Sequence, residues 1–173
     1  HYDPGTPDGS RPGRSSAPRA DLTALPKNQL EVIAYHEGLP GHHMQISIAQ
    51  ELEDVPQFRT QAGFTAYSEG WGLYSEVLAR EIPGTYADPY NRFGQLTSEI
   101  WRAIRLVVDT GLHAKGWTEQ QAIDYFMQNS PEPLESVRSE IQRYIVMPGQ
   151  ATSYKIGMLK IQQLRTKAEA ALG

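Results

Sequence analysis

The chain has 173 residues, of which 39% are hydrophobic and 21% are charged, a balance typical of one soluble globular domain with a real core. Its 16 basic and 20 acidic residues give a net charge of −4, which disfavours a protein that works on nucleic acid or on an anionic membrane. Because it has no cysteine, it can form no disulfide and no thiolate metal site, so any metal must be held by His, Asp or Glu.

The N-terminal segment differs in composition from the rest of the chain. It is rich in Pro, Gly, Ser and Asp, so we predict a loop or extended segment over residues 1–21 and a helical domain over residues 22–173, beginning near Leu22. The start "HYDPGTPDGSRPGRSS" has no Met and no apolar lead, which indicates a piece cut from a longer chain. No stretch approaches the roughly 18 apolar residues of a membrane span, so none is expected.

Apolar residues recur every three or four positions along most of the remaining chain, which predicts an all-α fold. Leu30, Ile33 and Ala34 mark one helix, and Met44, Ile48 and Leu52 mark the next. Further helices are predicted over residues 60–81, 89–115, 118–129, 133–146 and 150–171. Thr118 and Gln121 have the spacing of a capping box at the start of one of them. The only extended structure expected is a short segment near the N-terminus.

Between the first two helices lies "YHEGLPGHHMQ", residues 35–45. A zinc hydrolase needs three protein ligands, an open position for water, and a carboxylate beside that water. In His-Glu-x-x-His the two histidines lie one helical turn apart, but here Pro40 interrupts the helix. We interpret "GLPG" as a two-residue expansion that opens the backbone over residues 38–41, so that His36 and His42 are the ligands and Glu37 is the general base.

On this alignment His43 points elsewhere on the helix and contacts the substrate or supports the ligands. The alternative is that a break between two helices carries its histidines by chance, with no metal.

The third ligand is predicted in "AYSEGWGLYSE", on a neighbouring helix. Glu69 lies 27 residues after His42, which is enough for one helix, a turn and an antiparallel return. Glu76, two turns further along the same face, would accept the free ring N–H of a ligating histidine. Alternatively, both carboxylates are solvated on a helix surface, as most helix Glu residues are.

A second polar group is spaced by four residues along the predicted helix 89–115. Arg105, Asp109 and His113 lie on one face and could support the zinc ligands or bind a carboxylate. Equally, Arg105 and Asp109 could form an ordinary ion pair, with His113 near the C-terminal end of the helix, where a positive charge is favourable.

Four stretches, "HEGLPGHHMQ", "AYSEGWGLYSE", "RLVVDTGLHAKGWTEQQA" and "RYIVMPGQATSYKIG", occur in this order and resemble the C-terminal part of the bacterial domain of unknown function 885 family. The resemblance runs from about "PDGSRPG" to near the C-terminus. It implies a zincin-type, gluzincin-like zinc metallopeptidase related to carboxypeptidase Taq, thimet oligopeptidase and angiotensin-converting enzyme. It also implies a longer protein in the periplasm, secreted or lipoprotein-like, although the absence of cysteine fits the cytoplasm as well.

Those peptidases carry His-Glu-x-Gly-His, a ligating Glu one helix further on, and a Tyr after a Gly-rich turn that stabilises the tetrahedral intermediate. The resemblance therefore supports Glu69 as a ligand and implies that Tyr154, in "GQATSYKIG", is catalytic. The relatives have a histidine shortly before that tyrosine, where the nearest polar residues here are Arg143 and Tyr144. Arg143 and Gln150 are accordingly candidates for supporting or substrate contacts.

The sequence therefore predicts a zinc-dependent hydrolase of a peptide or small amide, with Glu37 as base for a metal-activated water. A zinc hydrolase of a non-peptide amide or ester, and a metal-free pseudoenzyme or interaction module, are the alternatives. We expect no nucleic-acid partner. Loss of an N-terminal half should leave apolar patches exposed, with dimerisation or weak activity as the consequence.

Overall fold

The computed structural model of the chain describes residues 1–16 and 26–173 and is mainly helical, which confirms the all-α prediction. Two short strands near the N-terminus, β1 and β2, pair in antiparallel fashion, with Tyr2 opposite Ser15. The elements are β1 (Tyr2–Asp3), β2 (Arg14–Ser15), η1 (Lys27–Gln29), α1 (Leu30–Glu37), α2 (His42–Gln50), α3 (Gln57–Gln61), α4 (Thr65–Leu78), η2 (Ala79–Glu81), α5 (Pro89–Lys115), α6 (Glu119–Asn129), α7 (Leu134–Val146) and α8 (Ser153–Leu172).

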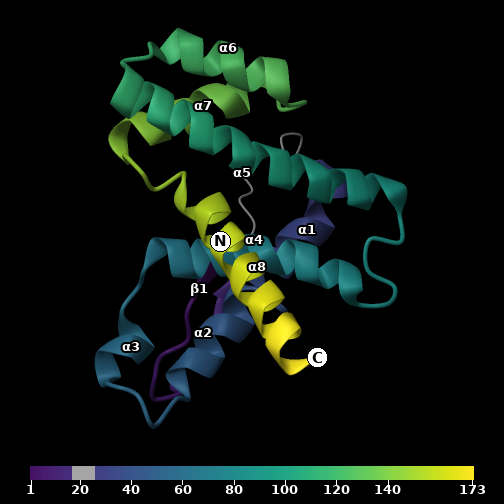
Figure 1. Cartoon of the computed structure of the whole chain (residues 1–173), viewed down its shortest axis with the longest axis vertical. Helices are drawn as coiled ribbons and strands as arrows, with labels where there is room; N and C mark the ends of the chain where they lie inside the picture. Colours follow the sequence, from purple (N-terminus) through teal and green to yellow (C-terminus); the bar gives the residue numbers. More distant parts are fainter. Residues whose placement is uncertain (17–25) are drawn as a thin grey trace.

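The helices form two groups that share the long helix α5 (Figure 1). In one group α6 and α7 pack on the C-terminal half of α5, around a core that includes Val108, Phe126 and Ile141. In the other group α4 packs against α8 and α1, and α2 follows α1. Because α1 and α8 also contact α5, residues from both groups can reach one site.

The contact between α4 and α8 in the second group depends on two glycines. A Cβ atom on Gly70 of α4 would lie 2.5 Å from the Cα atom of Gly157 of α8, and a Cβ on Gly157 would overlap the carbonyl oxygen of Ala66. The two backbones therefore touch, which no larger side chain would permit. The contact brings Tyr154, one turn before Gly157, onto the core formed by Leu73 and its neighbours.

Several element boundaries agree with the sequence and others differ from it. The predicted helices 89–115 and 118–129 are confirmed, including the Thr118 capping box. The predicted helix 60–81 is wrong in its first part, because Ala62 and Phe64 are extended around Gly63 and α4 starts at Thr65.

The predicted helix 150–171 also begins later than expected. α8 starts at Ser153, because Gly149 adopts a positive φ of 78° in the preceding turn. The predicted boundary of the packed domain near Leu22 lies outside the described residues. In the part of the chain that the structure describes, no helix has both the length and the hydropathy needed to cross a membrane.

We expect Gly157→Ala to destabilise the protein by about 1–3 kcal/mol or more, because the added methyl group forces α4 and α8 apart. The free energy of unfolding, measured by urea denaturation, checks this. Gly63→Ala is the matched control, since a Cβ at Gly63 meets no atom within 4 Å. Equal stability of Gly157→Ala and the native chain would show that the two helices do not need this close contact.

Candidate metal centre

The helix break predicted at residues 38–41 is present and is held in place by α4. α1 ends at Glu37 and α2 begins at His42, so the intervening loop separates the two histidines. Trp71 Nε1 and Ser75 Oγ both donate to the carbonyl oxygen of Pro40, at 2.8 and 3.2 Å. The loop is thereby fixed against the helix that carries Glu69.

His36, His42 and Glu69 come together, with one potential ligand atom from each within 4.8 Å of the others. Glu69 Oε2 lies 3.4 Å from His36 Nε2 and 3.3 Å from His42 Nε2. These distances exceed the roughly 2.8 Å of a charge-assisted hydrogen bond. They match the separation of about 3.3 Å between ligands that are each 2.0–2.1 Å from a tetrahedral zinc ion. The three residues therefore fit a zinc ion.

A glycine on α4 makes room for both imidazole rings. A Cβ atom on Gly72 would lie 2.8 Å from His36 Cε1 and Nε2 and 2.9 Å from His42 Cε1. The rings meet edge to face, with centroids 4.7 Å apart. Any side chain at Gly72 would displace them, so the glycine in "EGWG" has a steric role at the site.

Glu76 fixes the orientation of His36. Its side chain is 1% exposed, and its Oε1 lies 2.7 Å from His36 Nδ1, as expected if this ring nitrogen carries the proton. Ser98 Oγ donates to the other carboxylate oxygen at 2.6 Å. With Nδ1 occupied in this way, the Nε2 atom of His36 is directed at His42 and Glu69 and is free to bind a metal.

Electrostatic interactions in the cluster shift the pKa of two of its members. Burial lowers the pKa of His36, but the carboxylates of Glu69 and Glu76 raise it more, so it lies above its ordinary 6.5. Burial raises the pKa of Glu69, but interaction with His36 and His42 leaves it well below its ordinary 4.5. Without a metal, therefore, a proton occupies the cluster more readily than it would an isolated histidine.

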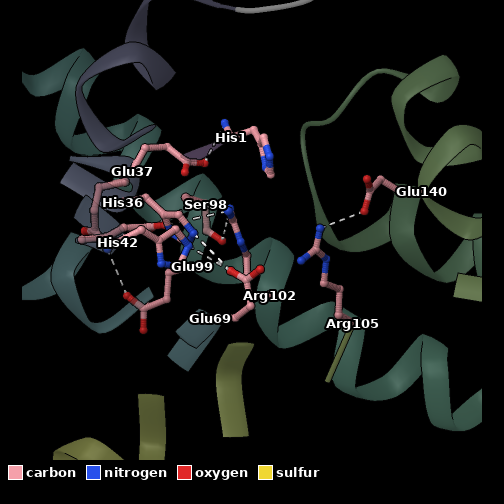
Figure 2. Close-up of polar contacts among 12 residues, drawn as sticks. His1, His36, Glu37, His42, Glu69, Ser98, Glu99, Arg102, Arg105 and Glu140 are labelled. Carbon is pink, nitrogen blue, oxygen red and sulfur yellow. Dashed lines mark hydrogen bonds and ion pairs between the residues drawn. The ribbon is translucent and has the colours of Figure 1, made fainter. Parts of the chain in front are cut away.

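Glu37 and Tyr154 line the same pocket as the three candidate ligands. The pocket has a volume of about 420 Å³, and its wall includes Tyr2, from the strand β1. Glu37 Oε1 lies 3.0 Å from the backbone nitrogen of His1, and its buried Oε2 has no hydrogen-bond partner among the described residues. Figure 2 shows the Glu37 carboxylate beside the His36 and His42 rings.

Tyr154 is placed by its stacking on His36 and by a neighbouring cation. Its ring centroid lies 6.3 Å from that of His36, at an interplanar angle of 25°. The guanidinium carbon of Arg105 is 4.5 Å from the Tyr154 centroid, on α5. The tyrosine predicted from the resemblance therefore faces the same pocket as Glu37.

The other predicted residues do not line this pocket. His43 is exposed on α2, and its Nδ1 lies 3.0 Å from the hydroxyl of Tyr2. Arg143 donates to Glu140 and Gln150, away from the three candidate ligands.

Arg105, Asp109 and His113 serve the contact between α5 and α7 and the turn after α7. Arg105 donates to Tyr144 Oη and to Glu140 rather than to Asp109, so the predicted Arg105–Asp109 pair does not form. Asp109 accepts from the Gly149 amide, and His113 Nε2 lies 2.9 Å from the Tyr144 carbonyl oxygen.

Sequence reasoning missed six of the residues that line the pocket, which are His1, Tyr2, Pro4, Ile46, Ser68 and Arg102. Arg102 follows Ser98 by four residues and precedes Arg105 by three, so all three lie within one broad face of α5. Extending the predicted Arg105 face by one turn towards the N-terminus would have found it. Tyr2 gave no comparable signal, because it lies in a segment predicted as loop.

The protein is thus a mainly helical one in which two histidines and a glutamate form a candidate metal centre. The chain belongs to the DUF885 family of bacterial proteins of unknown function, whose model matches residues 1–173. It is similar to the crystal structure of the "putative lipoprotein from Colwellia psychrerythraea", with a TM-score of 0.95 and 46% identity. The match covers 99% of this chain and 29% of that one, so this chain spans less than a third of that protein's length. Comparison with curated proteins gives no match.

We expect His42→Ala to abolish stoichiometric zinc binding, because Nε2 of His42 faces Glu69 and His36. His43→Ala is the matched control and should retain most of the zinc, because its ring contacts Tyr2 instead. Zinc per chain, measured by elemental analysis after dialysis, checks both variants. Loss of zinc in His43→Ala with retention in His42→Ala would reject this assignment.

In the metal-free chain, the contribution of this cluster to the free energy of unfolding should be largest between pH 4.5 and 6.5. Because the pKa of His36 is raised in the folded state, His36 contributes fully to the free energy of unfolding below pH 6.5. This contribution is lost as the pH rises through the pKa that His36 has in the folded protein. Because the pKa of Glu69 is lowered in the folded state, Glu69 contributes fully to the free energy of unfolding above pH 4.5. This contribution is lost as the pH falls through the pKa that Glu69 has in the folded protein.

Urea denaturation in the presence of a chelator, over a pH series, measures this dependence. His36→Gln should remove the fall in stability on the alkaline side. Added zinc should oppose that fall, because metal binding improves as the ligands lose their protons. An unchanged alkaline slope in His36→Gln would show that another group is responsible.

Proposed function

We propose that this chain forms the catalytic part of a gluzincin-like, zinc-dependent peptide hydrolase. The observation that carries the proposal is that Glu37 and Tyr154 share one pocket with His36, His42 and Glu69, and that the distances from Glu69 to the two histidines suit zinc. A metal-free interaction module would not require a glycine to make room for two facing imidazoles, nor a buried carboxylate to orient one of them.

His36, His42 and Glu69 would hold the zinc ion, which when bound supplies Lewis acidity to water and to a carbonyl group. Glu37 is suited to act as general base, because it follows His36 directly and one of its carboxylate oxygens has no partner within residues 1–16 and 26–173. The proton it accepts at that oxygen can then be passed to the leaving nitrogen.

Tyr154 would donate its hydroxyl hydrogen to the negative charge that develops on the carbonyl oxygen. Its ring stacks on His36 and lies 4.5 Å from the guanidinium carbon of Arg105, and these contacts restrict the movement of the ring. A donor that is already in place when the charge develops contributes most to the rate.

An exposed apolar groove on α5 also supports the proposal that this chain is part of a larger protein. Apolar side chains on α5, among them Phe93, Leu96 and Ile100, are 42–52% exposed and line a groove of about 560 Å³. We propose that the remainder of a longer chain covers this groove. When that remainder is absent, two copies of this chain associate through the groove. Resemblance to a lipoprotein favours a periplasmic or lipoprotein location.

We expect Glu37→Gln to bind zinc normally while losing hydrolysis by several orders of magnitude, because an amide cannot accept the proton. Tyr154→Phe should lower kcat by about a hundredfold to a thousandfold, the usual cost of one lost oxyanion donor. Steady-state kinetics on peptides identified by mass spectrometry, with zinc content measured alongside, check both.

The comparison uses the full-length protein loaded with zinc. Cleavage of amide or ester substrates without cleavage of any peptide would change the substrate class but keep the mechanism. Retained wild-type turnover in Glu37→Gln would remove Glu37 as base and with it the proposed reaction.

A further inference from the structure

Arg102 brings a positive charge into the pocket that holds the candidate ligands. Among the residues that the structure describes, it is the one Lys or Arg lining that pocket. Its side chain is 16% exposed and extends from α5 towards His36 and Ser98, whereas Arg105 points away to Glu140 (Figure 2). A largely buried cation at this position needs an explanation that the proposed hydrolysis does not yet contain.

Arg102 makes few hydrogen bonds with the residues that the structure describes. A guanidinium group has five N–H donors. Within residues 1–16 and 26–173, Arg102 hydrogen-bonds with Nη1 alone, to the Oγ and carbonyl oxygen of Ser98. No described residue accepts from its buried Nε, and its Nη2 is 3.8 Å from Glu76 Oε1, which is too far for a hydrogen bond.

The guanidinium is nevertheless held in position. Ser98 is bonded both to Arg102 and to Glu76, so it links the arginine to the residue that orients His36. The guanidinium carbon lies 5.6 Å from the ring centroid of Trp101 and 5.7 Å from that of Tyr154. A cation that is held by a hydrogen bond and packs near two rings loses little side-chain entropy when a ligand binds.

A role limited to balancing the charge of Glu76 does not explain this arrangement. Glu76 already accepts hydrogen bonds from Ser98 and His36, and Arg102 adds only a long-range attraction. Arg105 differs in that it bonds directly to Glu140 and Tyr144, although among the described residues its Nη1 is also buried without a partner. The Nη2 donors of Arg102, which no described residue accepts, are instead available to an anion in the pocket.

We propose that Arg102 binds a carboxylate of the substrate and so selects which peptides this site takes. The inference rests on the proposed peptidase function and names its substrate class. Carboxylates are the anionic groups of ordinary peptides, and a guanidinium matches their geometry. The carboxylate is either the C-terminus of the peptide or an acidic side chain, and the experiment separates these two sources.

The test uses the full-length, zinc-loaded protein and two pairs of peptides. One pair differs only in a free or an amidated C-terminus, and the other is amidated and differs only in an internal Glu or Gln. The carboxylate member of one pair should have a kcat/KM about ten- to a hundredfold higher, chiefly through a lower KM. The pair that shows the preference identifies the source, and no preference in either pair overturns the proposal.

Variants then assign the preference to Arg102. Arg102→Gln should bring the ratio of kcat/KM between the two peptides of the pair close to one. Arg102→Lys keeps the charge but not the planar guanidinium, so it should retain part of the preference. Arg138→Gln is the matched control, because Arg138 is half exposed on α7 and pairs with Glu135 outside the pocket. Circular dichroism and zinc content show whether each variant is folded and loaded.

The outcomes distinguish the roles open to Arg102. An equal fall in kcat for both members of a pair would assign it to the oxyanion or to Glu76 and overturn the proposal. If zinc binds but no peptide is cleaved, the proposed function fails, and calorimetric Kd values for the same pairs decide the role of Arg102. If Arg102→Gln does not fold, the wild-type ratio and Arg102→Lys decide it.

Discussion

The site depends on a carboxylate buried at the junction of three helices. Removing a carboxylate from water is costly unless hydrogen bonds and opposite charge replace the solvent. Glu76 of α4 meets this condition through His36 of α1 and Ser98 of α5, and its carbonyl oxygen accepts from Tyr86. These contacts tie the three helices together at one point. They also fix the direction of the His36 ring, on which the rest of the constellation depends.

The interruption at Pro40 has a positive role in this arrangement. In a continuous helix, residues 36 and 42 would lie about 120° apart in projection and could not face one another. The loop over residues 38–41 lets α2 begin in a new direction, and α4 holds that loop by two hydrogen bonds to the Pro40 carbonyl oxygen. The same helix supplies Glu69 and the glycine that makes room for both rings. One helix thus organises the whole set.

The two arginines of α5 show how surroundings separate similar residues. Arg105 donates to Tyr144 and Glu140 on α7, whereas Arg102 lines the pocket and, within the described part of the chain, donates only to Ser98. Tyr154 lies between this helix and His36 and is placed there by the close contact of α4 with α8. The packing that stabilises the second group of helices therefore also completes the pocket.

Local signals in the sequence determined much of this structure. Capping residues and apolar periodicity located α5 and α6, and Pro40 located the break, because these effects act within a few residues along the chain. The spacing of His36, His42 and Glu69 was enough to predict one shared metal site, because the residues between them suffice for a helix, a turn and an antiparallel return helix.

Tertiary packing decided the remainder. Arg102 and Arg105 are three residues apart, and only the orientation of α5 against α1, α4 and α8 determines which of them enters the pocket. Arg143 and Gln150 were directed elsewhere by the turn at Gly149, whose amide is bound by the distant Asp109. Tyr2 joined the pocket through a strand that periodicity could not reveal. These contacts join residues far apart in the chain, so their geometry follows from how whole helices pack and not from any local pattern.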